Sequence, residues 1–224
     1  MDTENLSTLE TGSKHEPKIH ATTSVRRLPS YLQVIRELRQ EEDEFISATV
    51  IARELRLESI QVRKDLAITG ISGIPKKGYP VEKLVNAIER FLGWDSNSKA
   101  VLVGAGNLGS ALMGYRGFLL HGLDIIAAFD IDPRKIGGKI HEITVQNAAS
   151  MDDQIRSLGV KIAILTVPSG CAQEAADILV RGGIEGIWNF TTVKLKVPAN
   201  IVVQQEDLSV GYALLKVKMK NREA

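Results

Sequence analysis

A glycine-rich turn directly follows an apolar run in the middle of the chain. The run Val101-Leu102-Val103 leads into Gly104-Ala105-Gly106-Asn107-Leu108-Gly109, which has the spacing G-x-G-x-x-G. Between a strand and a helix, the first glycine permits a tight turn, the second lets the backbone approach a pyrophosphate, and the third lets the helix pack closely on the strand. The N-terminus of that helix adds N–H donors and a partial positive charge. The turn therefore predicts a pyrophosphate-binding site.

Asp130 stands at the end of the next apolar run, residues 125–129. An acid about 20 residues beyond the glycine-rich turn accepts hydrogen bonds from the adenosine ribose in dinucleotide-binding folds. Because its charge repels the 2′-phosphate of NADP(H), we expect NADH and NAD⁺ as the ligands. The alternative is a glycine-rich turn in a parallel sheet that holds no ligand.

A second set of polar and basic residues lies in the first third of the chain. Residues 45–55 and 59–70 predict two helices separated by a short break, which is a helix-turn-helix pattern. The first half of the second helix in such a motif meets base edges in the major groove, where Arg suits guanine and Gln suits adenine. The candidate DNA-binding residues are Ser59, Gln61, Arg63, Lys64, Lys76 and Lys77. The alternative is a solvated charged face, because this geometry also occurs in proteins that never touch DNA.

The elements that position these residues fall into two groups. In the first, a helix begins near Pro29, and Ser47 or Thr49 caps the next helix. Residues 71–81 predict a two-stranded hairpin, and residues 81–92 predict a further helix. Three helices followed by a hairpin describe a winged helix.

In the second group, from Lys99 onward, strands alternate with helices. Strands are predicted at residues 100–103, 125–129, 162–166, 186–189 and 201–204, and helices at residues 108–121, 151–158 and 173–182. Continuous runs of Val, Ile, Leu and Ala imply a parallel sheet with helices on both faces. The segment 205–220 predicts an amphipathic terminal helix whose apolar face needs a covering surface. That face carries Leu208, Tyr212, Leu215 and Met219.

The composition fits a globular chain of one or two domains, because 44% of the 224 residues are apolar and 25% are charged. With a net charge of +1, any nucleic-acid binding must use positive charge that is concentrated locally. One cysteine excludes a disulfide framework and a cysteine-based zinc site, and we expect no metal. No apolar run approaches a membrane span and the polar N-terminus has no signal sequence, so we expect no membrane partner and a cytoplasmic location.

A dehydrogenase would need a proton donor or acceptor beside the reacting carbon. The four histidines are His15, His20, His121 and His141, and none falls near the predicted nicotinamide end of the site. No substrate domain follows the dinucleotide unit, so we expect binding without turnover and no enzyme activity. Cys171, at a predicted helix start, is either a redox-sensitive thiol or, more simply, a small buried residue.

The two motifs, in this order, resemble the bacterial redox-sensing repressors of the Rex family. The resemblance covers about residues 18–215 and is carried by Ala21-Thr22, Arg27-Leu28-Pro29-Ser30-Tyr31, Gln61-Val62-Arg63-Lys64-Asp65-Leu66, the glycine-rich turn through Tyr115-Arg116-Gly117-Phe118, Phe129-Asp130-Ile131-Asp132-Pro133, Leu165-Thr166-Val167-Pro168 and Asn189-Phe190. It implies an α/β chain with an N-terminal winged helix, a C-terminal Rossmann domain with a parallel, doubly wound sheet, and a C-terminal helix exchanged between subunits. The expected divisions are a disordered tail at 1–23, the winged helix at 24–94, the NAD(H)-binding domain at 98–205 and the dimerisation helix at 206–224.

The resemblance also implies a transcriptional repressor that senses the NADH/NAD⁺ ratio. NADH binding would close a homodimer and release a palindromic double-stranded operator. The residues implied to hold the cofactor are Gly104, Ala105, Gly106, Asn107, Leu108, Gly109, Asp130, Ile131, Asp132, Thr166, Val167, Pro168, Asn189 and Phe190. Arg27, Tyr115 and Asp207 match the positions that link redox state to domain orientation.

Three departures from the pattern of the family leave alternatives open. The basic residues of the wing come two positions late, within residues 74–79, and Thr191-Thr192 stands where Ala-Pro is usual. The helix after Asp207 carries Gly211 and several lysines. The main alternative is therefore a paralogue that binds DNA and dinucleotide but discriminates weakly, or not at all, between reduced and oxidised cofactor. An NAD-dependent oxidoreductase is the other.

Overall fold

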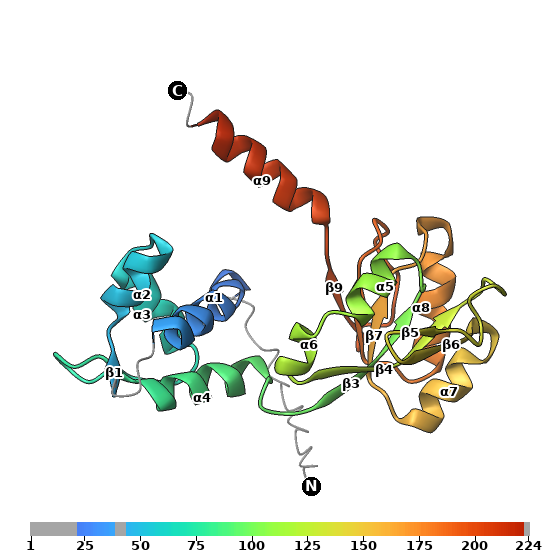
Figure 1. Cartoon of the computed structure of the whole chain (residues 1–224), viewed down its shortest axis with the longest axis horizontal. Helices are drawn as coiled ribbons and strands as arrows, with labels where there is room; N and C mark the ends of the chain where they lie inside the picture. The colour runs from blue at the N-terminus through green and yellow to red at the C-terminus, as the bar shows by residue number, and fades with distance from the viewer. Residues whose placement is uncertain (1–21, 39–43, 222–224) are drawn as a thin grey trace, which may run out of the picture. The chain divides into compact units, whose positions relative to one another are not determined.

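The computed structural model describes residues 22–38 and 44–221, so most of the tail expected at residues 1–23 lies outside the described part. The chain forms two compact units that divide after Gly93 (Figure 1). The first unit holds the predicted DNA-binding residues and the second the predicted dinucleotide site.

Unit 1 is a small helical body with a two-stranded sheet. Its elements are α1 (Thr22–Leu38), β1 (Phe45–Ile46), α2 (Ala48–Leu55), α3 (Ser59–Ala67), β2 (Tyr79–Pro80) and α4 (Val81–Leu92). The hydroxyl of Ser47 caps α2 by accepting from the N–H of Val50 at 3.2 Å, as one of the two expected caps. Apolar side chains at helical spacing form the core, including Leu28, Leu32, Ile35, Ile51, Val62, Leu66, Leu84 and Ile88. The arrangement is the predicted winged helix.

Two local predictions in unit 1 are wrong. The first helix begins at Thr22, so residues 22 and 23 are helical and Pro29 lies inside α1 rather than in its first turn. Packing of the buried face of α1 offsets the missing N–H of that proline. The hairpin expected over residues 71–81 is much shorter than predicted and has no regular strand pair of its own in the described chain. Instead, β2 pairs antiparallel with β1, and residues 74–78 close a tight turn through a single bridge.

Unit 2 is a three-layer α/β fold around a seven-stranded sheet. Its strands are β3 (Ser98–Val103), β4 (Leu123–Asp130), β5 (Lys139–Ile140), β6 (Ile143–Asn147), β7 (Ile162–Leu165), β8 (Gly186–Asn189) and β9 (Val202–Gln205). The strand order is β5-β6-β4-β3-β7-β8-β9, and all pairs are parallel except β5 with β6. From β6 to β9 this is the strand order of a Rossmann sheet. The order in which strands are added reverses between β3 and β7, which is the topological switch point.

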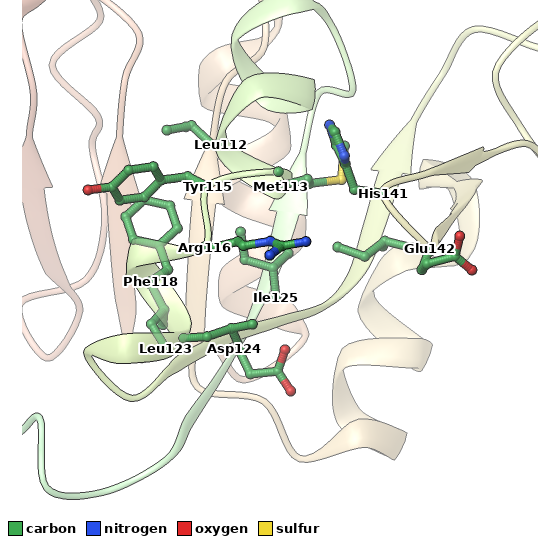
Figure 2. Close-up of a pocket in the computed structure, with 13 residues that line it drawn as sticks. Leu112, Met113, Tyr115, Arg116, Phe118, Leu123, Asp124, Ile125, His141 and Glu142 are labelled. Carbon is green, nitrogen blue, oxygen red and sulfur yellow. The ribbon is translucent and has the colours of Figure 1, made fainter.

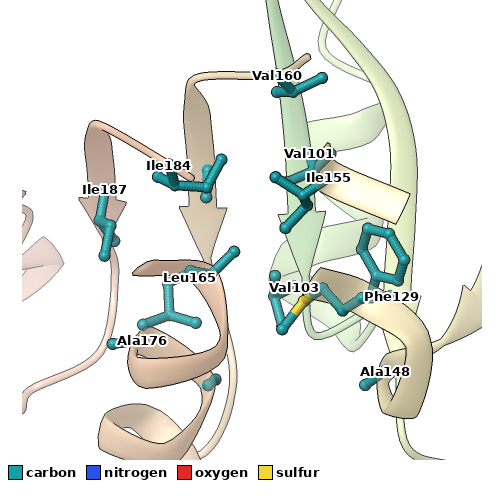
Figure 3. Close-up of a cluster of buried hydrophobic side chains, with 14 of the residues drawn as sticks. Val101, Val103, Phe129, Ala148, Ile155, Val160, Leu165, Ala176, Ile184 and Ile187 are labelled. Atoms are coloured by element: carbon teal, nitrogen blue, oxygen red, sulfur yellow. The ribbon is translucent and has the colours of Figure 1, made fainter. Parts of the chain in front are cut away.

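The helices cover both faces of this sheet, as predicted. They are α5 (Asn107–Met113), α6 (Gly117–Leu120), α7 (Met151–Leu158) and α8 (Ala172–Arg181), with short 3₁₀ turns η1 (Ala148–Ser150) and η2 (Ser169–Cys171). The last helix, α9 (Leu208–Lys220), follows β9 and does not pack on the sheet. Alternate residues of β3 point to opposite faces. Val101 and Val103 join the core under α7 and α8 (Figure 3), while Ala100 and Leu102 join the core under α5.

Two features of unit 2 differ from the sequence prediction. The single helix expected over residues 108–121 is broken into α5 and α6 at residues 114–116, where the ring of His141 leaves no room for a side chain at Gly114. Strands β5 and β6 were not predicted, because they are short and lie at the edge of the sheet, where only Val145 is buried. Within the described ranges, no helix is long and apolar enough to cross a membrane. Those ranges also hold no cluster of three or more metal-ligating side chains.

The terminal helix α9 has no buried residue in the single chain. Successive residues turn by about 100° in an α-helix, which sorts its large apolar side chains into two opposite stripes. One stripe is Leu208, Tyr212, Leu215 and Met219, and the other is Val210, Leu214 and Val217, all at least half exposed. The sequence analysis identified only the first stripe. A helix that is apolar on opposite sides needs two covering surfaces.

Candidate functional site

The predicted dinucleotide site lies at the topological switch point between β3 and β7. Gly104 follows β3 and Thr166 follows β7, so the carboxyl ends of these neighbouring strands border one crevice, the usual ligand position in such sheets. The cavity there measures about 670 Å³. Its lining is Val103, Gly104, Gly106, Leu108, Phe129, Asp130, Ile131, Lys135, Asn147, Ala148, Ala149, Met151, Thr166, Val167, Pro168, Cys171, Glu174, Ala175, Ile178 and Phe190.

The three motif glycines have distinct roles. Gly104 has a φ of +98°, and a Cβ there would lie 2.8 Å from the backbone of Thr166. A Cβ at Gly109 would lie only 2.1 Å from the carbonyl oxygen of Gly104, so α5 packs directly on the turn. A Cβ at Gly106 would meet nothing within 4 Å. That open space faces the crevice at the N-terminus of α5, which fits the close approach of a pyrophosphate.

Asp130 ends β4 at the edge of the crevice and is almost fully buried. Its Oδ2 accepts from the N–H of Ala105 and from the Lys135 ammonium, each at 2.8 Å. Its Oδ1 accepts from the N–H of Asp132 at 2.8 Å. Burial alone would raise the pKa of Asp130, but the bonds from Lys135, Asp132 and Ala105 outweigh it and lower the pKa below 3.8. The carboxylate is therefore ionised at neutral pH.

The crevice brings together nine of the fourteen predicted cofactor residues. These are Gly104, Gly106, Leu108, Asp130, Ile131, Thr166, Val167, Pro168 and Phe190. The other five support the site from behind or beside it. The N–H of Ala105 holds Asp130, Gly109 packs on the turn, and Asn107 begins α5. Asp132 pairs with Arg134. Asn189 is buried.

The sequence analysis missed one whole wall of the crevice. Asn147 ends β6, Ala148 and Ala149 belong to η1, Met151 begins α7, and Lys135 comes from the loop after β4. Because β6 was not predicted as a strand, nothing indicated that its carboxyl end would join the site. The signal that could have found this wall is the position of the third parallel strand in a Rossmann unit.

The far end of the crevice is shaped by Asn189 and Phe190 at the end of β8. The buried amide of Asn189 donates to the carbonyl oxygen of Val193 at 2.9 Å and to Oε1 of Gln205 at 2.8 Å. Its carbonyl accepts from the N–H of Thr191 at 3.0 Å. Asn189 therefore holds the loop that carries Phe190 and does not line the crevice.

Phe190 separates the crevice from a second cavity, also of about 670 Å³. Thr191, Thr192 and Asp207 line this second cavity. The Asp207 carboxylate caps α9, and its hydrogen bonds from Ser209 lower the pKa of Asp207. A ligand that moves Phe190 would therefore also change the second cavity, which the first residues of α9 line.

Tyr115 lies at a third cavity, of about 560 Å³, beside the break between α5 and α6 (Figure 2). Its side chain is more than half exposed, and its ring meets Phe118 edge-on with 4.9 Å between centroids. The ring of His141 lies against Gly114, where a Cβ would come within 2.6 Å of Nε2. Tyr115 is thus displayed on the surface of unit 2.

In unit 1 the buried carboxylate of Asp65 joins α3 to α1. It accepts from Nε and Nη2 of Arg27 at 2.6 and 2.9 Å, from Ser24 at 2.7 Å, from Gln61 at 2.8 Å and from the Tyr31 hydroxyl. Burial alone would raise the pKa of Asp65, but these hydrogen bonds hold it well below its usual range. The network fixes the orientation of α3.

This network engages two residues for which other roles were predicted. Gln61, predicted to read a base, bonds Asp65 within its own helix, and Arg27, predicted as a switch residue, bonds it from α1. Arg63 and Lys64 are exposed on α3, and Ser59 is half-buried at its start. The sequence analysis missed Ile60, which is 61% exposed in the first turn of α3.

The predicted wing residues lie in the turn closed by Ile74 and Gly78. Lys76 and Lys77 are exposed there, and the ammonium of Lys77 lies 5.3 Å from the centroid of the Phe45 ring. A Cβ at Gly78 would lie 2.4 Å from the carbonyl oxygen of Ile46, so the turn packs tightly on β1. Both lysines therefore project from a fixed loop.

Two further sequence candidates have defined positions. Cys171 is partly exposed at the end of η2 and lines the crevice. His121 follows α6 and stacks on Trp94 with 3.8 Å between ring centroids, and His141 lies in the β5–β6 turn. Among the described residues that line the crevice there is no histidine and no tyrosine.

Two family models match the chain, one in each unit. A model described as "Putative DNA-binding protein N-terminus" matches residues 21–67, and one described as "CoA binding domain" matches residues 95–193. The first ends with α3, and the second contains the glycine-rich turn and most of the sheet.

Relatives match nearly the whole chain. A redox-sensing transcriptional repressor Rex from Treponema denticola is 56% identical over 92% of this chain and 98% of its own length. One from Bacteroides thetaiotaomicron is 38% identical over 86% and 87%. Among solved structures, RSP in complex with β-NAD⁺ and operator DNA superposes with a TM-score of 0.83 and 34% identity over 92% of this chain and 95% of that chain. RSP with β-NADH gives a TM-score of 0.82 and 33% identity over 92% and 97%.

The glycine geometry predicts opposite effects for two alanine variants. Gly106→Ala places a methyl group in open space and should leave thermal unfolding unchanged while weakening NADH binding at least about tenfold, by blocking the approach of the pyrophosphate. Gly109→Ala drives a methyl group into the Gly104 carbonyl and should lower the unfolding temperature. Calorimetry and NADH fluorescence titration measure the two effects. Unchanged NADH affinity in a folded Gly106→Ala protein would contradict the assigned site.

The Asp65 network predicts acid sensitivity of unit 1. Because the folded pKa of Asp65 lies below the unfolded value, its stabilisation is complete above about pH 4 and is lost as pH falls further. Asp65→Asn should lower the free energy of unfolding of unit 1 by about 3 kcal/mol at pH 7, as loss of a buried ion-pair partner does. It should also reduce the acid dependence.

Far-UV circular dichroism in urea measures this change. Both tryptophans, Trp94 and Trp188, lie in unit 2, so their fluorescence reports unit 2 alone and serves as an internal control. Glu37→Gln, which removes an exposed acid of α1 that bonds Gln33, is the matched variant and should change little. Equal unfolding of Asp65→Asn and wild type would count against the network.

Proposed function

The chain belongs to the Rex family of redox-sensing transcriptional repressors, and we propose that it binds operator DNA through α3 and releases it when NADH occupies the crevice. The observation that carries this proposal is that one chain builds both a dinucleotide crevice and an exposed basic helix held by a buried network. The proposed site binds the cofactor and leaves it unreacted. As a repressor acting on chromosomal DNA, the protein would work in the cytoplasm.

The glycine-rich turn and the N-terminus of α5 would hold the pyrophosphate, and Asp130 the adenosine ribose. The supporting observations are the open space at Gly106 and the ionised carboxylate of Asp130. Val167, Pro168 and Phe190 supply the apolar surface at the other end, where the nicotinamide would lie. RSP, a relative with 33% identity, has been crystallised with β-NADH.

On α3, Arg63 and Lys64 would meet guanine edges and phosphates, and the wing residues Lys76 and Lys77 would meet phosphates. Ile60 would contact a thymine methyl group, since it is the exposed apolar residue in the first turn of α3. Gln61 would act mainly by keeping α3 in register through Asp65.

We propose that two copies form the working unit through α9. The helix has two opposite apolar stripes and no covering surface in the single chain, which fits insertion between two surfaces of a partner copy. A dimer also doubles the number of recognition helices, as a palindromic operator requires. The exchange of α9 between subunits is part of this proposal.

The switch would be a shift in population between an open and a closed dimer. If NADH binds the closed form 100-fold more tightly than the open form, saturation favours closure by about 2.7 kcal/mol per site, and two sites double this. Phe190 lines both the crevice and the cavity at Asp207, so it offers a route from the crevice to the start of α9. Tyr115, exposed beside α6, and Arg27 in unit 1 remain proposed contributors.

A second candidate function is a repressor of the same fold that no longer distinguishes NADH from NAD⁺. It is favoured by Thr191 and Thr192, which replace the usual Ala-Pro. Thr192 bonds Ser169 at 3.0 Å, and Thr191 is buried. Calorimetric titration of both cofactors separates the candidates, because a sensor binds NADH much more tightly and the alternative binds both alike.

The proposed function predicts that saturating NADH weakens operator binding at fixed salt, whereas NAD⁺ leaves it largely intact. Arg63→Ala should weaken operator binding by about 1–3 kcal/mol and leave NADH affinity unchanged. Arg181→Ala on α8 removes the same charge from unit 2 and is the control. Fluorescence anisotropy of a labelled operator measures each affinity. Equal affinity with and without NADH would refute the proposal.

The role of α9 predicts that a charge on either stripe breaks the dimer. Leu215→Lys and Leu214→Lys alter opposite stripes and should each reduce the mass in solution to that of one chain, 24.5 kDa. Lys218→Gln, which lies between the stripes, should leave the dimer intact. Light scattering after gel filtration gives the masses. Persistence of the dimer in both lysine variants would argue against assembly through α9.

A further inference from the structure

An ion pair lines the part of the crevice where the adenosine ribose is expected. The Lys135 ammonium lies 2.8 Å from Oδ2 of Asp130, and both residues line the crevice together with Ile131 and Asn147. The side chain of Lys135 is about one-third exposed and that of Asp130 is 8% exposed. The ionised acid that is proposed to recognise the ribose is therefore already paired with a neighbouring cation.

The hydrogen bonds of Asp130 leave it limited capacity for a ligand. An ionised carboxylate offers about four acceptor positions. Ala105 and Lys135 use two positions on Oδ2, and the N–H of Asp132 uses one on Oδ1. The remaining position, on Oδ1, can accept one ribose hydroxyl, so Asp130 alone cannot engage both hydroxyls of the ribose without a rearrangement.

Lys135 has the complementary capacity. Its ammonium carries three donors, of which one bonds Asp130. The other two can donate to oxygen atoms in the crevice, whether hydroxyl or phosphate. The adjacent cation Arg134 makes two bonds to Asp132 and does not line the crevice.

We propose that Lys135 is a second ribose-recognition residue, and that the Lys135–Asp130 pair decides how the crevice distinguishes NAD(H) from dinucleotides phosphorylated at the ribose 2′-oxygen. The inference rests on the proposed function only in taking the crevice as the NADH site. Asp130 accepts one ribose hydroxyl while Lys135 donates to the other. A 2′-phosphate is repelled by Asp130 and attracted by Lys135, so the acid must remain charged for NADPH to be excluded.

The pair therefore contains a latent NADPH site that Asp130 suppresses. Removing the charge of Asp130 releases Lys135 to face the 2′-phosphate without opposition. A charge-assisted hydrogen bond to phosphate is stronger than one to a hydroxyl, so NADPH gains more than NADH from the released ammonium. Removing Lys135 alone has the reverse effect, because the carboxylate is then unscreened.

The test compares NADH and NADPH by fluorescence titration in four forms of the full chain. These are wild type, Asp130→Asn, Lys135→Met and the double variant, with thermal unfolding recorded for each. Lys139→Met, an exposed lysine of β5 outside the crevice, controls for the loss of one positive charge. Wild type should prefer NADH, and Asp130→Asn should reduce that preference roughly tenfold or more, the worth of one hydrogen bond to a charged group.

In the Asp130→Asn background, Lys135→Met should weaken NADPH binding roughly tenfold and NADH binding much less, as expected for the loss of a contact to a charged phosphate. Lys135→Met alone should increase the preference for NADH. The inference is overturned if Lys135→Met has no larger effect on NADPH than Lys139→Met in either background. If wild type binds no NADH at all, the proposed function fails as well, so the two failures are distinguishable.

Discussion

The close contact between the glycine-rich turn and the end of β7 is the constraint on which the dinucleotide site depends. Gly104 meets the backbone of Thr166, and Gly109 meets the carbonyl of Gly104, with no room for a side chain at either position. This contact brings the N-terminus of α5 to the topological switch point between β3 and β7. It also sets the N–H of Ala105 against Asp130. The glycine-rich turn and Asp130, which we propose hold the pyrophosphate and the ribose, are thus parts of one packed arrangement.

Unit 1 also contains a buried, ionised carboxylate that holds neighbouring segments together. Asp65 is a buried carboxylate whose charge is balanced by Arg27 and whose acceptor positions are filled from two helices. It orients α3 much as Asp130 orients the glycine-rich turn. In both units, a buried acid that is costly by itself becomes stabilising because its partners are fixed by the surrounding elements. Each functional surface therefore depends on the integrity of one ionised side chain.

The sequence predicted the crevice and the family because both depend on local spacing. The glycine motif, Asp130 and the runs of β3, β4, β7 and β8 can be recognised from neighbouring residues alone. The β1–β2 pairing, the break between α5 and α6 and the wall from β6 could not be, because each depends on contacts between distant segments. At the break, Gly114 lies against the ring of His141, which is distant in the sequence. The second apolar stripe of α9 also has helical spacing in the sequence, but only the first stripe was predicted.

Polar networks were also beyond the reach of the sequence. The i,i+4 spacing of Gln61 and Asp65 allows their hydrogen bond within one helix. Nothing in the spacing indicates that Arg27 also bonds Asp65, or that Lys135 bonds Asp130. These contacts bear on the roles predicted for Gln61 and Asp130. Gln61 bonds Asp65 within α3, and Asp130 is one half of an ion pair with Lys135.

The central claim is that the crevice and α3 are energetically coupled, and coupling between two binding sites must be reciprocal. The most direct measurement is therefore the NADH dissociation constant of the full chain with and without a saturating operator duplex, at one salt concentration. If the two sites are coupled, operator DNA weakens NADH binding by the same factor by which NADH weakens operator binding. An NADH dissociation constant that is unchanged by operator would contradict it.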